Sequence, residues 1–174
     1  MKLDFPVMAA ALLLAAALQS LLPPLHGSAL ALKLPILPAV ALYYVLQRQM
    51  PLGIFAALWA GILLDATGAV PAGTSSVTRV IVAAAVMSLK QYMPEASVTV
   101  SGLVGMVTVL LLVVVQYCAL RTRTPFRAPP YLILRPLATI LPLSFVATPL
   151  IAFCLSRIDL AAGNVKPRKE VEGK

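Results

Sequence analysis

The sequence is short of the side chains that most active sites need. Only six of its 174 residues are acidic, and it has a single histidine, His26. One histidine excludes the zinc motif H-E-x-x-H, which needs two histidines. A serine hydrolase needs a base beside its nucleophile, and no second histidine is present to supply one. An intramembrane aspartyl protease needs two aspartates that face each other within membrane segments, and only Asp65 lies in a suitable position. We therefore expect no enzymatic activity, no metal and no cofactor.

Cysteine is also scarce, and negative charge is outweighed by positive charge. Cys118 and Cys154 each lie in an apolar run, without the spacing of a metal site or a disulfide framework, and are expected to be small membrane-buried side chains. A net charge of +8 would suggest nucleic acid in a soluble protein. Here the basic residues lie between apolar runs or at the chain end, where topology and anionic lipid headgroups account for them. No nucleic-acid partner is expected.

Apolar residues are what the sequence has in abundance. They make up 60% of the chain, its mean hydropathy is +0.94, and only 11% of its residues are charged. Soluble domains are roughly 45 to 50% apolar and could not hide this much apolar surface. One membrane crossing takes roughly 20 helical residues, so six crossings would use most of the chain. The sequence predicts an all-α, polytopic integral membrane protein with about six transmembrane helices.

The predicted six-helix transmembrane domain occupies residues 1–158, and the basic tail at 159–174 is expected to be disordered. The first apolar run resembles a signal peptide, but several hydrophobic runs follow it, which favours a retained span. The sixth run contains several prolines and is expected to form one kinked or tilted helix, with a re-entrant bend as the alternative. The predicted spans are 5–25, 30–46, 52–66, 75–92, 98–120 and 131–156.

The basic residues favour one orientation narrowly. With six spans, both termini share one side with eight of the fourteen lysines and arginines, and six lie on the other side. The positive-inside rule then places the termini in the cytoplasm. A basic loop on the outer side acts against this orientation; it contains Arg121, Arg123 and Arg127. Either this loop contacts an acidic partner or lipid, or it is a tolerated exception.

Small side chains line one face of the third predicted span. Steps of three and four residues return to the same side of a helix. The residues that share this face are Gly53, Ala57, Gly61, Asp65 and Gly68. Small residues let helix backbones approach closely, so this face is expected to pack against another helix or a partner. Gly68, Pro71 and Gly73 are expected to form the reversal into the fourth span.

Asp65 is the acid at the end of this stripe. A carboxylate left alone at the bilayer centre costs about 3 kcal/mol, so it should find a partner or water. One expectation is an ion pair with Arg79, the nearest base in the next span, which would lock the turn. The alternative is that Asp65 ends the helix at the interface, solvated and unpaired.

A second stripe of small residues opens the fifth predicted span. It consists of Ser101, Gly105 and Thr108, with Gly102 beside it. Close contact between helices inside the protein is its expected use, and an interface with a partner protein is the alternative.

The segment from the second span into the turn resembles the best-marked segment of the MreD family of rod shape-determining proteins. The resemblance lies in a Gly-x-x-x-Asp element, Gly61 to Asp65, followed by a Gly-x-x-Pro-x-Gly turn, Gly68 to Gly73. Leu37-Pro38, Tyr43-Tyr44 and Gly53 precede these motifs. Outside residues 37–73 the chain is similar to the family in length, number of spans and basic tail.

This resemblance implies a non-enzymatic component of the bacterial inner membrane that helps organise lateral peptidoglycan synthesis and maintain rod shape. Its implied partners are the bitopic scaffold MreC, RodA, a class B penicillin-binding protein and, indirectly, the actin-like MreB. The family's fold is similar to the six-helix substrate-binding component of energy-coupling-factor vitamin transporters. The alternative function is therefore the substrate-binding membrane component of a small-molecule transporter, which would need a polar pocket between helices.

Overall fold

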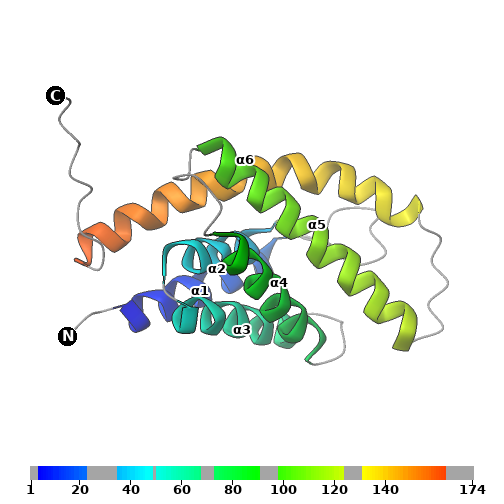
Figure 1. Ribbon diagram of the computed structural model, residues 1–174, viewed down its shortest axis with the longest axis horizontal. Helices are drawn as coiled ribbons and strands as arrows, with labels where there is room; N and C mark the ends of the chain where they lie inside the picture. The colour runs from blue at the N-terminus through cyan, green and yellow to red at the C-terminus, as the bar shows by residue number, and fades with distance from the viewer. Residues whose placement is uncertain are drawn as a thin grey trace.

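The structure is a computed structural model that describes residues 4–22, 35–48, 50–67, 73–90, 98–123 and 131–163. All regular elements within these ranges are α-helices (Figure 1), which confirms the prediction of an all-α fold. The helices are α1 (Asp4–Leu21), α2 (Ile36–Gln47), α3 (Met50–Thr67), α4 (Thr74–Lys90), α5 (Val98–Arg123) and α6 (Tyr131–Ala161).

Two of the described helices are long and apolar enough to cross a membrane, judged by length and composition. The segments concerned are Val98–Cys118 of α5 and Leu137–Ala161 of α6. Three further segments are apolar but shorter: Phe5–Leu21, Ile36–Gln47 and Met50–Ala66. Large apolar side chains on the outside of α5 and α6 are exposed, as expected of helix surfaces that face lipid rather than water.

Helix α2 lies at the centre of the bundle. It contacts α1 and α3 on one side and α6 on the other, and it also touches α4 and α5 (Figure 1). Eight of its 12 residues are buried, because a helix that is apolar all round needs neighbours on every side. At 1.5 Å per residue it is only about 18 Å long, which is less than the roughly 30 Å of a bilayer's hydrocarbon core.

Helix α2 begins at Ile36, later than the predicted span of 30–46; residues 30–34 lie outside the described residues. Pro35 is its N-cap residue, and proline at this position fits a helix start because it has no N–H to leave unsatisfied. The N–H of Leu37 donates to Oε1 of Gln19 on α1 at 3.0 Å. A side chain of the preceding helix thus satisfies one of the free donors at this buried end.

Helix α6 is one continuous helix of 31 residues, about 46 Å long. It passes through Pro142 and Pro149 without the re-entrant bend that was the alternative. It also extends past the predicted boundary between domain and tail, so placing residue 159 in a disordered tail is wrong. Asp159 is 1% exposed, and its buried partners, described below, hold the last turn in place. The helix ends before Gly163, whose φ of 70° is typical of a helix C-terminus.

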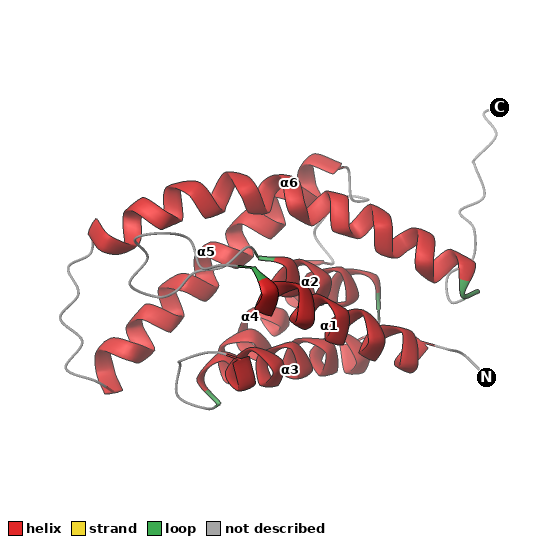
Figure 2. Cartoon of the chain, turned by 180° about the vertical axis from the view of Figure 1, so that it is seen from behind, coloured by secondary structure: helices red, strands yellow, loops and turns green. Residues whose placement is uncertain are grey.

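The two ends of the described chain lie close to the same end of the molecule. The start of α1 and the end of α6 are both on the left in Figure 1 and on the right in the reversed view of Figure 2. Helices α3 and α4 form the most extensive helix pair, and α5 packs between α4 and α6. Because α3 packs mainly against α4, the small-residue stripe of α3 and its end near Asp65 both lie beside the buried face of α4.

Candidate functional site

The small-residue stripe of α3 is the surface on which α4 packs. Gly61 is buried, and a Cβ atom at this position would overlap Cα of Ser76 and lie 2.9 Å from its backbone N. A Cβ on Gly53 would overlap a methionine side chain of α4 and lie 3.1 Å from Cα of Val45 on α2. Ala57 lies between the two glycines and is buried. The stripe thus brings α3 against α4 and α2, inside the protein.

Asp65 lies near the end of α3 and caps the N-terminus of α4. Its carboxylate accepts hydrogen bonds from the backbone N–H groups of Gly73 (2.9 Å), Ser75 (3.1 Å) and Ser76 (3.3 Å), and from the Ser76 hydroxyl (2.9 Å). The N–H groups in the first turn of a helix have no partner within it. Gly73 precedes α4 and has no side chain with which to cap it, so Asp65 supplies the acceptor, and its charge suits the positive end of the helix dipole.

The predicted ion pair between Asp65 and Arg79 is wrong. Both side chains are described, and they form no salt bridge with each other, although the carboxylate attracts the guanidinium electrostatically from a greater distance. The donors at the start of α4 occupy the carboxylate, and Arg79 lies about one turn farther along that helix. The alternative of a solvated, unpaired Asp65 does not hold either, because the carboxylate has the four donors described above.

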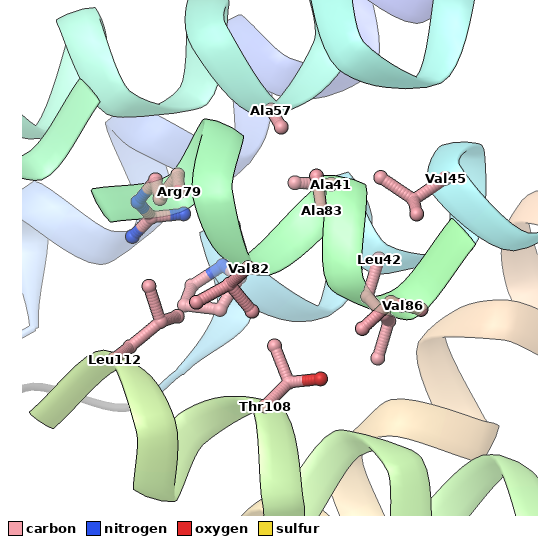
Figure 3. A pocket seen from close by; sticks show the side chains of 11 residues that line it. Ala41, Leu42, Val45, Ala57, Arg79, Val82, Ala83, Val86, Thr108 and Leu112 are labelled. Atoms are coloured by element: carbon pink, nitrogen blue, oxygen red, sulfur yellow. The ribbon is translucent and has the colours of Figure 1, made fainter. Parts of the chain in front are cut away.

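Arg79 is instead buried on the side of α4 that faces α2 and α5. The residue is 6% exposed, and within the described part of the chain its guanidinium has no hydrogen bond or ion pair. It lines a cavity of about 30 Å³ between α2, α3, α4 and α5 (Figure 3). The remaining wall is aliphatic except for Thr108 on α5, whose buried hydroxyl has no hydrogen-bond partner among the described residues.

The small-residue stripe of α5 packs against α6. A Cβ on Gly105 would overlap the Thr148 side chain, and a Cβ on Gly102 would lie 2.8 Å from the carbonyl oxygen of Phe145. Ser101, the first residue of the stripe, is half-buried. Gly102 and Gly105 therefore serve contact between two helices of this chain, the first of the two uses considered from the sequence, whereas Thr108 lines the cavity beside Arg79.

The predicted basic loop begins within a helix. Arg121 and Arg123 belong to the last turn of α5, which continues to residue 123 and not to 120 as predicted. No glycine or proline interrupts the sequence there, and cations are favoured at a helix C-terminus by the helix dipole. Arg121 is exposed.

Three of the predicted site residues lie outside the described residues: Gly68, Pro71 and Arg127. Gly73, the last residue of the predicted reversal, is described and has a φ of 88°. Glycine adopts this left-handed conformation without the steric penalty of a Cβ, which accounts for its place directly before α4.

A buried polar cluster at the end of α2 was missed by the sequence analysis. Asp159 accepts hydrogen bonds from the hydroxyl of Tyr43 at 3.0 Å and from Nη2 of Arg48 at 3.1 Å, the latter as an ion pair. Nζ of Lys90 donates to the backbone oxygen of Arg48 at 3.3 Å. The cluster joins the C-terminal ends of α2, α4 and α6. One signal was available: Asp159 lies four residues after Leu155, so both fall on one face of the last span.

Comparison of the chain with protein-family models, curated proteins and solved structures finds no match. Within the part of the chain that the structure describes, no group of three or more His, Cys, Asp and Glu side chains could hold a metal ion. What the site offers is a close helix–helix contact, a capped helix end and a buried guanidinium beside a small cavity. These features suit packing and binding.

Proposed function

We propose that this protein is a non-enzymatic, six-span component of the bacterial inner membrane that works in the cell-wall elongation complex, as its resemblance to MreD implies. It binds MreC and stands with RodA and a class B penicillin-binding protein, and through them with MreB. Its role is to help organise lateral peptidoglycan synthesis and so maintain rod shape. Both termini face the cytoplasm.

The observation that carries the proposal is how the MreD-like residues are used. Gly61 has no side chain, which lets the backbone of Ser76 on α4 pack against it, and Asp65 caps the N-terminus of α4. Both ends of the Gly-x-x-x-Asp element therefore serve one contact, that of α3 with α4. A motif whose residues build a helix pair, and not a reactive centre, favours a protein that acts by presenting surfaces.

The two long helices supply surfaces of the kind that such a protein needs. On α5 the exposed apolar side chains recur at helical spacing: Leu103, Val107, Leu111 and Val114. Helix α6 exposes Val146, Leu150 and Phe153. Helices in lipid associate through close van der Waals packing, so these stripes are candidate contacts for the transmembrane helices of partners.

The alternative function, a vitamin-type transport component, has less support. Pockets that enclose a small molecule usually measure roughly 300 to 1,000 Å³. The cavity beside Arg79 measures about 30 Å³ and is mostly aliphatic. Its size favours the scaffold over the transporter.

Co-purification from the native host tests the proposal. The tagged protein is solubilised in mild detergent, and what stays bound is identified by mass spectrometry. We expect MreC, RodA or the penicillin-binding protein at near-stoichiometric levels. Recovery of an ATPase pair and a coupling subunit would support the transport function instead, and recovery of neither set would contradict the proposed complex.

Matched substitutions on the two exposed stripes then locate the contact. Val107→Trp on α5 and Val146→Trp on α6 each add the same bulk to a face that no other described helix covers. We expect one of the two to lower the recovery of MreC several-fold while the other leaves it unchanged. Because both side chains are exposed, neither substitution should alter the amount of folded protein, which gel filtration checks.

A further inference from the structure

Arg79 is a buried charge without a direct contact partner in the described part of the chain. The residue is 94% buried, with 6% of its surface exposed, and it has no hydrogen bond or ion pair within the described ranges. An arginine side chain stays protonated at any physiological pH, so it cannot escape the cost of burial by losing its proton. A buried charge in an apolar setting needs a counter-charge, and intramembrane arginines commonly mark ion or ligand sites.

Asp65 attracts the guanidinium electrostatically but forms no ion pair with it, so the guanidinium keeps no anion in direct contact among the described residues. Its carboxylate binds the first turn of α4, where it offsets the positive end of the helix dipole. Arg79 follows about one turn later on the same helix, among residues of α2 and α5 that are apolar except for Thr108. The Asp65 carboxylate is therefore shared: it contacts the start of α4 directly and acts on the guanidinium only from a greater distance.

The register of α4 against α5 shows what faces Arg79. Nε2 of Gln116 on α5 donates to the Ser75 hydroxyl on α4 at 3.3 Å. One turn on from this contact, in opposite directions along the two helices, come Arg79 and Leu112, and one turn further come Ala83 and Thr108. These last four residues all line the cavity (Figure 3), so the side chain opposite the guanidinium is aliphatic.

We propose that this cavity binds a small monovalent anion, of the class that includes chloride and formate, with Arg79 as its anchor. About 30 Å³ gives room for roughly two water-sized groups, which suits a halide or a single carboxylate and excludes a nucleotide or a vitamin. The aliphatic wall lowers the local dielectric constant, which strengthens the charge interaction. This site is independent of the scaffold function proposed above.

Thermal unfolding of the full chain, purified in detergent, tests the site. The probes are sodium chloride and sodium formate, each titrated against sodium gluconate at constant ionic strength, since gluconate is too large for the cavity. An anion that binds the folded state stabilises it in proportion to ln(1 + [L]/Kd). We expect a rise in Tm of about 3 to 6 °C at ten times Kd that continues with the logarithm of the concentration, in at least one of the two small anions.

A matched pair of variants keeps the test independent of Arg79 itself, whose replacement could impair folding. Leu112→Glu places a carboxylate opposite the guanidinium, and Leu112→Gln places a neutral side chain of nearly the same shape there. We expect Leu112→Glu to abolish the anion dependence and to raise Tm in gluconate, and Leu112→Gln to keep at least part of the dependence. Arg79→Gln should abolish it as well.

Three results would overturn the site. One is a Tm that responds equally to all three salts in the unsubstituted protein. Another is a small-anion effect of the same size in the unsubstituted protein, Leu112→Glu and Arg79→Gln. The third is a stabilisation that depends on Arg79 but appears only in nanodiscs with phosphatidylglycerol, which would assign the guanidinium to a lipid headgroup.

Discussion

At the scale of single residues, polar side chains of one helix accept hydrogen bonds from the N–H groups at the start of the next helix. Gln19 of α1 binds the N–H of Leu37 in the first turn of α2, and Asp65 of α3 binds three N–H groups at the start of α4. Water normally solvates such groups, and it is scarce inside an apolar bundle. A side chain that reaches across from a neighbouring helix replaces the missing water and fixes the position of the helix end.

Replacing Asp65 should therefore destabilise the α3–α4 pair. Asp65→Ala leaves the donors of Gly73, Ser75 and Ser76 without this acceptor, and we expect a loss of about 2 to 3 kcal/mol in the free energy of unfolding. Unfolding in increasing sodium dodecyl sulfate, followed by the fluorescence of Trp59 on α3, measures it. Ser76→Ala removes only the hydroxyl hydrogen bond and should cost about 1 kcal/mol. Equal stability of Asp65→Ala and the unsubstituted protein would contradict the capping role.

The importance of Asp65 could be read from the sequence, but its partner could not. Its place at the end of a stripe of small residues indicated that it faces another helix. Arg79 was the obvious partner because sequence displays side-chain charges, whereas the donors that bind Asp65 are mostly backbone N–H groups, which every residue except proline carries. The choice among them depends on how α3 and α4 are placed in space.

At the scale of helices, the contact between α5 and α6 depends on Gly102 and Gly105 of α5 and on Pro149 of α6. Pro149 has no N–H, so the carbonyl of Phe145 lacks its usual partner four residues on. That oxygen would lie only 2.8 Å from a Cβ atom placed on Gly102. The absence of a side chain on Gly102 therefore lets α5 lie close to the freed carbonyl.

Enlarging Gly105 should push α5 and α6 apart. A Cβ there overlaps the Thr148 side chain, so Gly105→Ala should lower the free energy of unfolding by about 1 to 3 kcal/mol. Thr148→Ala removes the hydroxyl and methyl groups of that side chain, so the double variant should regain part of the loss. The same detergent unfolding assay compares the four proteins. Strictly additive losses would show that the two residues do not meet.

The helices themselves were largely predictable, and their ends were not. Apolar runs bounded by prolines, glycines and charges indicated six helices, and six are present in the described residues. Hydropathy could not show that α2 is short, because a buried central helix and a membrane span are equally apolar. Nor could it show that α6 reaches Ala161, because Asp159 looks like the start of a polar tail until its partners on α2 are known.

At the scale of the whole molecule, the Tyr43–Arg48–Asp159 cluster ties the centre of the bundle to its last helix. Asp159→Leu leaves Arg48 and Tyr43 without their buried acceptor, and we expect it to destabilise the protein by about 3 kcal/mol. Removing the charge of Arg48 as well, in Arg48→Met/Asp159→Leu, should be less damaging than the single change, because the charge that Asp159 balances is then removed with it.

A nearby arginine gives the control for that cycle. Arg157 is exposed and stacks on Phe153, with its Cζ 5.1 Å from the ring centroid. Arg157→Met should change the unfolding free energy by less than about 1 kcal/mol. If Arg157→Met and Asp159→Leu gave losses of the same size, the buried cluster would have no special part in holding α6.

The separation of Arg48 from Asp159 also sets the order in which this protein can mature. The two are 111 positions apart, and translation proceeds at roughly 5 to 20 residues per second, so the arginine is made about 6 to 20 s before its acid. During that interval α2, too short to cross a bilayer by itself, lacks both α6 beside it and the Asp159 carboxylate at its end. Its final burial must therefore wait for the last segment to leave the ribosome, and truncation before residue 159 should yield a chain in which the side of α2 that contacts α6 stays uncovered.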